Sequence, residues 1–173
     1  FVSAIFTNLT QDHLDYHRSM PAYFRAKARL FRMLDAKAAA VLNLDDPYAR
    51  QLRRLTPARV ISYALEQRAD VSARIRNMTV NASECVVRAF GRTYPLRLRL
   101  TGRHNLYNAL AVFAWGLSQG FSARQVCASL EAFSQVPGRL ERVAAGGRNV
   151  CSVFVDYAHT EDALRNVLST LRQ

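Results

Sequence analysis

Three short apolar runs alternate with two segments that carry helix signals over residues 1–64. The runs span residues 2–6, 39–44 and 59–64, and Ser19 with Pro21 suits the start of the first helix. Strands that alternate with helices predict a parallel sheet with helices on its faces, an α/β fold. The apolar stripe of the first helix is expected to be Tyr23, Ala26, Leu30 and Leu34.

Residues 70–100 change character, because apolar and polar side chains alternate there. The alternation covers Val71–Ile75, Cys85–Ala89 and Tyr94–Leu100, with Gly91 and Arg92 in a tight turn. This pattern predicts a small antiparallel β meander at the edge of the sheet.

Two further helices and a separate strand–helix unit are expected after the meander. The helices open near Thr101 and Ser122, and the pair Gly146-Gly147 suits a boundary between domains. A buried strand at 150–155 and a last helix from Thr160 should follow. The core side of that last helix is expected to carry Leu164, Leu168 and Leu171.

The composition describes a chain that can bury a real core. Of the 173 residues 50% are hydrophobic, no apolar run is long enough to span a membrane, and the three cysteines suit reduced thiols. The net charge of +11 is concentrated in residues 49–103, which carry twelve basic and three acidic side chains. Aromatic residues are not interleaved with these arginines, so a solvated face is favoured, with attraction of an anionic substrate second.

Residues 7–17, TNLTQDHLDYH, place two histidines and two carboxylates between the first strand and the first helix. Such loops often carry functional groups in α/β proteins, so His13, His17, Asp12 and Asp15 invite a metal site. The spacing matches no standard zinc signature, however, and histidines also serve as ordinary hydrogen-bonding loop residues. The cluster alone leaves both interpretations open.

Lys27 lies beside the apolar stripe of the first helix. A lysine there either extends its ammonium group to water or faces a cavity, where desolvation leaves part of the amine neutral and nucleophilic. Position alone favours the first interpretation.

Polar residues at three other element ends are candidate ligands, each with an ordinary structural alternative. Asn43 and Asp45 follow the second strand, where they could bind a ligand or cap the next helix. Asn105 and Asn108 share a face at a helix N-terminus, where carboxamides cap a helix or match an adenine edge. Asp156 follows a later strand and suits a ribose, a metal or a turn.

Five stretches of the chain, taken in order, match motifs of one enzyme family. They are TNLTQDHLDYH with YFRAKARLF (7–17 and 23–31), LNLDDP (42–47), TGRHNLYNALA (101–111), VPGRLERV (136–143) and VDYAHTEDALRNVL (155–168). With them the chain resembles the ATP-dependent Mur ligases of peptidoglycan synthesis. The DHLDYH form is similar to the MurE type, which adds the third residue of the stem peptide.

The resemblance implies an amide-bond ligase that adds diaminopimelate or lysine to UDP-N-acetylmuramoyl-L-Ala-D-Glu. In the family, ATP phosphorylates the substrate carboxylate, an amine attacks the acyl phosphate, and Mg²⁺ offsets the charge. It also implies a carbamylated Lys27 at one magnesium ion and His13 at the other, because a carbamate is an oxygen ligand. The residues that match nucleotide positions are Asn105 and Asn108 for adenine, Arg139 for the phosphates, Asp156 for the ribose, and Tyr157 and His159 in the same loop.

The family's fold divides the chain in two. Residues 1–143 should be the latter part of the central ATP-binding domain, and residues 148–173 the first strand and helix of a Rossmann-like C-terminal domain. No G-x-x-x-x-G-K-[ST] loop is present, so it is expected upstream, and this piece alone should not turn over. The whole enzyme should be a cytoplasmic monomer without nucleic-acid or membrane partners. Three departures from the family pattern, none expected to touch the chemistry, are Arg18, His104 and Glu161.

Three other functions compete with this one. A sibling Mur or folylpolyglutamate-type ligase would differ in residues beyond 173. A zinc hydrolase would use the His13 and His17 cluster and retain stoichiometric zinc. A nucleic-acid-binding module would rest on the basic middle segment and bind with a steep salt dependence.

Overall fold

The computed structural model describes residues 1–10, 19–134, 136–143 and 152–172. Within them, six strands form one sheet in the order β1-β2-β3-β4-β5-β6. The pairs from β1 to β4 are parallel, and the pairs β4–β5 and β5–β6 are antiparallel. The strands are β1 (Ser3–Phe6), β2 (Ala39–Asn43), β3 (Arg59–Ala64), β4 (Val71–Thr79), β5 (Ala82–Ala89) and β6 (Arg92–Leu98). The predicted α/β fold with an antiparallel meander at one edge is confirmed.

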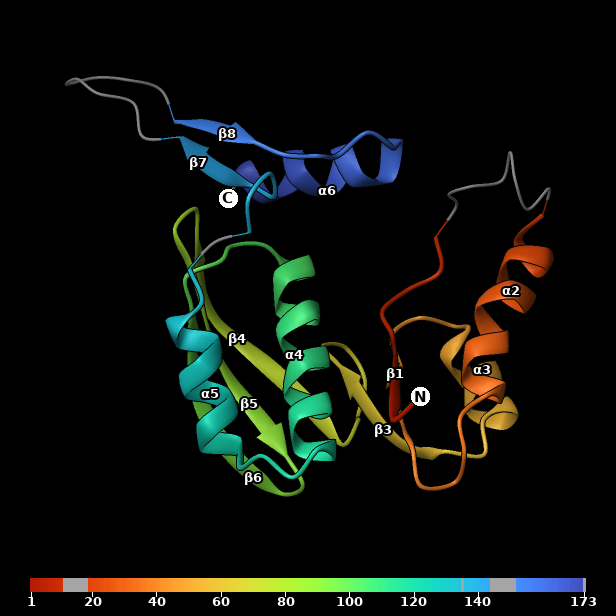
Figure 1. The fold of residues 1–173 in the computed structure, drawn as a ribbon. Helices are drawn as coiled ribbons and strands as arrows, with labels where there is room; N and C mark the ends of the chain where they lie inside the picture. Colours follow the sequence, from red (N-terminus) through yellow and green to blue (C-terminus); the bar gives the residue numbers. More distant parts are fainter. Residues whose placement is uncertain (11–18, 135, 144–151, 173) are drawn as a thin grey trace.

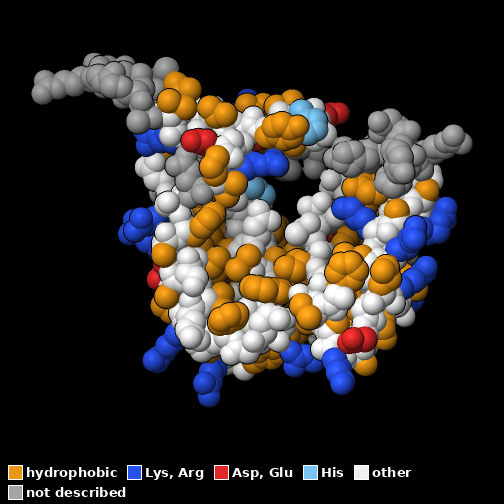
Figure 2. Space-filling model, viewed as in Figure 1, with side chains coloured by type: hydrophobic (Ala, Val, Ile, Leu, Met, Phe, Trp, Pro, Cys, Tyr) orange, Lys and Arg blue, Asp and Glu red, His pale blue; other side chains and the backbone are white. Residues whose placement is uncertain are grey.

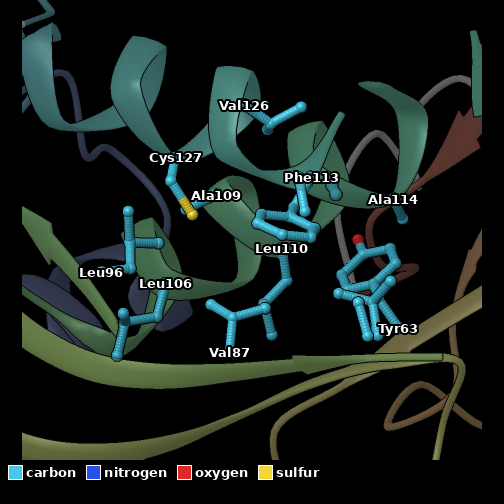
Figure 3. Packing of buried hydrophobic residues seen from close by; sticks show 14 of the residues in the cluster. Tyr63, Val87, Leu96, Leu106, Ala109, Leu110, Phe113, Ala114, Val126 and Cys127 are labelled. Atoms are coloured by element: carbon cyan, nitrogen blue, oxygen red, sulfur yellow. The ribbon is translucent and has the colours of Figure 1, made fainter. Parts of the chain in front are cut away.

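Helices cover both faces of this sheet (Figure 1). One face carries α2 (Met20–Arg32) and α3 (Ala49–Leu55), and the other carries α4 (Arg103–Ser118) and α5 (Ala123–Ala132). Strand β2 is apolar on both sides, because Ala40 and Leu42 join the core under α2 whereas Val41 joins the core under α4. In the second core, Leu110 and Phe113 of α4 lie over Val87 of β5 (Figure 3).

The buried face of α2 differs from the expected stripe. The buried residues are Phe24, Ala28, Phe31 and Leu34, whereas Ala26 and Leu30 are exposed and Tyr23 is half-buried. Phe24 stacks on Tyr48 with ring centroids 5.1 Å apart, and Phe31 meets the edge of Phe6 at 6.3 Å. Aromatic rings bury more apolar area than alanine does, so they decide which face turns inward. With this face of α2 turned inward, Lys27 is half-buried at the rim of the core.

The ends of the other helices follow the expected local signals. Ser122 and Gln125 form a reciprocal capping box at the start of α5. Gly120, with φ +87°, ends the connection from α4 in a left-handed conformation that suits glycine.

A second, smaller unit contains β7 (Glu141–Val143), β8 (Val153–Val155) and α6 (Glu161–Leu171). The two strands pair antiparallel with each other, and the unit lies across one end of α4 (Figure 1). Strand β7 lies at the end of the range expected for the central domain, yet it pairs with β8, which lies after the expected boundary. The division between residues 143 and 148 therefore stays a prediction.

The burial expected in this unit is wrong for most of its described residues. Val153 and Val155 are exposed in β8, and Leu164 and Leu168 are 46% and 59% exposed in α6. The reason is that two strands and one helix provide too few layers to cover both faces of each element.

Two expectations about composition concern the described ranges alone. No helix there combines the length and apolar character that a membrane span requires. Cys85 and Cys127 are buried and free, as expected for reduced thiols.

Candidate functional site

A central cavity of about 380 Å³ lies where β1 and β2 end and α4 begins. This is the carboxyl edge of parallel strands, where open α/β sheets bind ligands. Figure 2 shows a hollow on the same side of the molecule, below the unit that contains α6. The cavity is lined by Thr7, Asn8, Thr10, Asn43, Asp45, Asp46, Pro47, Arg103, His104, Tyr107, Asn108, Ser169 and Thr170.

Three smaller hollows adjoin the central cavity or one another through shared wall residues. The lysine hollow, about 170 Å³, holds Lys27 and shares Thr7 and Asn8 with the central cavity. The apolar pocket, about 290 Å³, shares Asn108 with it. The arginine hollow, about 120 Å³, holds Arg139 and shares Asn105 with the apolar pocket. Four predicted site residues, Lys27, Asn108, Asn105 and Arg139, therefore line a row of neighbouring hollows that share wall residues.

Lys27 enters this row from α2. Its Nζ donates to the backbone oxygen of Asn8 at 3.4 Å and lies 4.9 Å from the centre of the Tyr23 ring. Among the residues that the structure describes, no carboxylate pairs with it. The amine is thus held beside the cavity by a carbonyl and an aromatic face, which differs from simple extension into water.

Asn105 and Asn108 supply polar groups to the wall of the apolar pocket, which also includes residues of β6, α4 and α5. Asn105 Nδ2 donates to the Thr101 oxygen at 2.8 Å, so one amide hydrogen serves the helix start. Neither carboxamide caps a free N–H of α4 in the described hydrogen bonds, which leaves Asn108 available to a ligand. The apolar lining consists of Leu98, Leu100, Ala109, Val112, Leu130, Phe133 and Val136.

Arg139 lies beside Tyr157 and His159, which belong to a later segment of the chain. The Arg139 guanidinium lies 5.4 Å from the Tyr157 ring centre, and the Tyr157 and His159 rings are 5.0 Å apart. Asp156 anchors the arrangement, because its carboxylate accepts from Leu140 N and from Ala158 N, both at 2.7 Å. Asp156 therefore acts as a turn residue in this structure, the alternative that the sequence left open.

Asn43 and Asp45 do not cap α3 through their side chains. Asn43 Nδ2 donates to the Thr7 oxygen at 2.8 Å, and its Oδ1 accepts from Asp45 N at 3.1 Å. Asp45 accepts from three successive amides, 65–67, at 2.7–3.1 Å. Both side chains hold neighbouring loops in place around the cavity.

His104 is one of the three departures from the family pattern, and the expectation that it does not touch the chemistry stays a prediction. The residue lines the central cavity near Asp156 and Arg139. Burial lowers the pKa of its imidazole, the nearby Asp156 carboxylate opposes that change, and Arg139 adds to it.

Other residues escaped the sequence reasoning or fall outside the described ranges. Tyr107 and Asp46 line the cavity, and only the Asp45-Asp46 doublet at a strand end could have signalled the second. His13, with Asp12, Asp15 and His17, lies outside the described residues.

Residues 1–116 match the family model of the Mur ligase middle domain. The chain belongs to the Mur ligase family. A UDP-N-acetylmuramoyl-L-alanyl-D-glutamate--2,6-diaminopimelate ligase from Geobacter metallireducens is 46% identical over 180 residues, covering 100% of this chain and 35% of the relative. The ligase of the same name from Lactiplantibacillus plantarum is 39% identical over 176 residues, covering 98% and 35%. The chain thus spans about a third of the length of the curated relatives it matches.

Solved structures of Mur ligases share this fold. A UDP-N-acetylmuramoyl-L-alanyl-D-glutamate--2,6-diaminopimelate ligase is similar with a TM-score of 0.80 at 29% identity, covering 98% of this chain and 35% of that one. MurF from Acinetobacter baumannii reaches 0.88 at 22% identity, covering 99% and 37%. MurF from Thermotoga maritima in complex with ADP reaches 0.83 at 18% identity, covering 98% and 39%. The two MurF likenesses establish the fold alone.

Proposed function

We propose that the chain is part of an ATP-dependent ligase that adds diaminopimelate or lysine to UDP-N-acetylmuramoyl-L-Ala-D-Glu. ATP phosphorylates the terminal carboxylate of that substrate, and the amine of the incoming amino acid displaces phosphate from the acyl phosphate. The identity of 46% to a diaminopimelate ligase supports this reaction. The observation that carries the proposal is the row of hollows, which runs from Lys27 past Asn8 and Asn108 to Arg139.

The apolar pocket suits the adenine base. Its walls offer apolar contact to a flat ring, and Asn105 and Asn108 in the same walls offer the donor and acceptor groups that an adenine edge requires. Arg139 lies in the adjoining arginine hollow, where its guanidinium binds the anionic phosphates of the nucleotide. We place Tyr157 and His159 beside the nucleotide and Asp156 at the ribose, where it also keeps the loop in shape.

Lys27 fits a magnesium site only as a carbamate. An ammonium group has no lone pair for a metal, whereas a carbamate provides the oxygen donors that Mg²⁺ prefers. Lys27 lines the lysine hollow, and its Nζ lies 3.4 Å from the Asn8 backbone oxygen, so the amine is open to CO2 from the hollow. With His13 as a ligand of a second magnesium ion, the two bound ions would neutralise charge on the transferring phosphoryl group.

The organisation of the whole enzyme belongs to the same proposal. Residues 1–143 are the latter part of the central ATP-binding domain, and residues 148–173 begin the C-terminal domain. The phosphate-cradling loop lies upstream, so residues 1–173 alone do not turn over. The enzyme acts as a cytoplasmic monomer on small substrates.

The test uses the full-length ligase and its two matched lysines. Lys27 and Lys37 are the lysines of this stretch, and Lys27→Arg keeps the positive charge but cannot form a carbamate. We expect Lys27→Arg to lower kcat at least about 10²-fold, because charge neutralisation at the phosphoryl group is lost. Lys37→Arg, an exposed position, is the control and should keep wild-type turnover.

Mass spectrometry gives a readout that is independent of turnover. A gain of about 44 daltons, the mass of CO2, is expected on the peptide that contains Lys27 and not on the peptide that contains Lys37. An unmodified Lys27 in a fully active enzyme would contradict the carbamate. Turnover that needs no added diaminopimelate or lysine would contradict the ligase.

A further inference from the structure

The segment 7–10 leaves β1 and crosses the wall of the central cavity without joining a strand or a helix. Three contacts from other elements hold its backbone at successive residues. Asn43 Nδ2 donates to the Thr7 oxygen at 2.8 Å, Lys27 Nζ donates to the Asn8 oxygen at 3.4 Å, and Leu9 N donates to Asp46 Oδ2 at 2.7 Å. Lys27 thus contacts the segment at Asn8, between the residue that β2 binds and the residue that the turn after β2 binds.

We propose that Asn43 and Asp46 are positioning residues for the ligase reaction. They fix the 7–10 segment so that the Asn8 oxygen, and through it Lys27 Nζ, stays at the cavity. The proposal rests on the function proposed above, since it gives these two residues their purpose. Neither side chain contacts the substrate in this proposal, because the polar atoms of both side chains already form hydrogen bonds with backbone groups.

Burial strengthens the hydrogen bonds that Asn43 and Asp46 form with the segment. Asn43 is 6% exposed and Asp46 is 8% exposed. Each side chain also bonds its own turn: Asp46 Oδ1 accepts from Tyr48 N at 2.9 Å, and Asn43 Oδ1 accepts from Asp45 N at 3.1 Å. A buried carboxylate costs free energy unless its oxygens accept hydrogen bonds, so the turn and the segment must stay together.

The position of Lys27 Nζ depends on these hydrogen bonds to the 7–10 segment, because the lysine side chain is long and flexible. It comes from α2, on another part of the chain, and the Asn8 oxygen is its hydrogen-bond acceptor among the described residues. A shift of the 7–10 segment by about 1 Å would move that acceptor, and a misplacement of this size can lower turnover about 10²-fold. The effect should therefore appear in kcat, with little change in nucleotide binding at the apolar pocket, whose walls include none of these residues.

Asp35, an exposed residue, serves as the control for Asp46. Asp35 also accepts two backbone amides in a turn beside β2, from Lys37 N at 2.8 Å and from Ala38 N at 2.9 Å. That turn precedes β2, at the end of the strand away from the cavity. Asp35→Ala therefore removes a similar pair of hydrogen bonds without touching the 7–10 segment.

The experiment compares Asp46→Ala, Asp46→Asn and Asp35→Ala in the full-length ligase. We expect Asp46→Ala to lower kcat by about 30- to 100-fold while KM for ATP changes less than about 3-fold. Asp46→Asn keeps one acceptor oxygen and should recover most of that loss. Hydrogen exchange in the peptide that spans Leu9 should quicken in Asp46→Ala, and the mass gain at Lys27 should fall, whereas Asp35→Ala changes neither.

Three outcomes separate the two proposals. Equal kcat losses in Asp46→Ala and Asp35→Ala would reduce Asp46 to a stabilising residue and overturn the positioning role. Wild-type kcat in Asp46→Ala, with faster exchange at Leu9, would overturn it as well. A wild-type protein that shows no ATP-dependent ligation would instead remove the proposed function.

Discussion

The hydroxyl of Tyr107 donates a hydrogen bond to Asp45 Oδ2 at 2.9 Å and ties the first turns of α4 to the end of β2. Burial raises the pKa of this phenol to about 12, and the bond to the Asp45 carboxylate contributes in the same direction. A second tie lies beside it, an ion pair between Arg103 and Glu66. These contacts set the height of α4, and therefore of Asn108, relative to the carboxyl edge of the sheet.

Tyr107→Phe should weaken nucleotide binding with a small loss of stability. The change removes one hydrogen bond but leaves Asp45 its three backbone donors, so the free energy of unfolding should fall by about 1 kcal/mol. KM for ATP in the full-length ligase should rise about 3- to 10-fold, because Asn108 follows directly in α4. Tyr94→Phe, whose ring packs on Phe113 at 6.0 Å, is the control. An unchanged KM in Tyr107→Phe would show that core packing alone positions the helix.

Gly102→Ala should destabilise the contact between α4 and α6. Gly102 has φ +95°, and a Cβ there would lie 2.7 Å from a His104 ring carbon and 3.0 Å from Thr170 Cγ2. Gly120→Ala is the matched control, because its φ of +87° carries the same backbone strain with no atom within 4 Å. Backbone strain should cost both variants about 1 kcal/mol, and the collision should add at least about 1 kcal/mol to Gly102→Ala. Equal shifts in Tm would mean that the His104 ring and α6 both move aside freely.

His104 should make the stability of the fold depend on pH. Its pKa lies below the ordinary 6.5 in the folded chain, mainly because the ring is buried, so the unfolded chain binds the proton more readily. The stability present above pH 6.5 is therefore lost as the pH falls through the folded pKa. Denaturant unfolding between pH 7.5 and about 5 should show a smaller loss for His104→Phe than for the wild type. Parallel curves for the two proteins would assign the pH dependence to other groups.

Cys85 and Cys127 should resist thiol reagents in the native state. Burial raises the pKa of the Cys85 thiol to about 11 and that of Cys127 in the same direction, with Glu131 adding to the second. Because the thiolate is the reactive species, labelling at pH 8 should be slow until the chain unfolds. Time-resolved mass mapping with and without urea measures both peptides. Rapid native labelling of Cys85 would show that the core between β5 and α5 opens readily.

Residues with a strong local pattern were predictable. Apolar runs between capped helices predicted β1 to β3, and the alternation of apolar and polar residues predicted the meander. Each strand or helix carries its own period and end signals. The face of α2 was not predictable in the same way, since Phe24 and Phe31 lie on a competing stripe and their ring partners, Tyr48 and Phe6, are distant in sequence. Local periodicity cannot choose between two stripes when the partner surface decides.

The candidate site divides in a similar way. Asn105 and Asn108 stand out from the sequence as polar groups at a helix start, Lys27 stands out beside an apolar stripe, and all three match one family. Asp46 and Tyr107 do not, because their partners, Leu9 and Asp45, are 37 and 62 residues away. Asp156 stood out from the sequence as a ligand candidate, but one of its oxygens accepts from Ala158 N in its own turn and the other accepts from Leu140 N, 16 residues away.

The amino-acid sequence by itself determined the α/β class, the order of the elements and the membership in the Mur ligase family, since these follow from periodicity and from motifs read along the chain. Only the tertiary structure decided that Lys27 faces the Asn8 oxygen, that His104 lines the cavity and that Asp46 holds Leu9. The physical reason is that these relationships are distances between elements. Packing of side chains far apart in sequence sets such distances, and no local pattern encodes them.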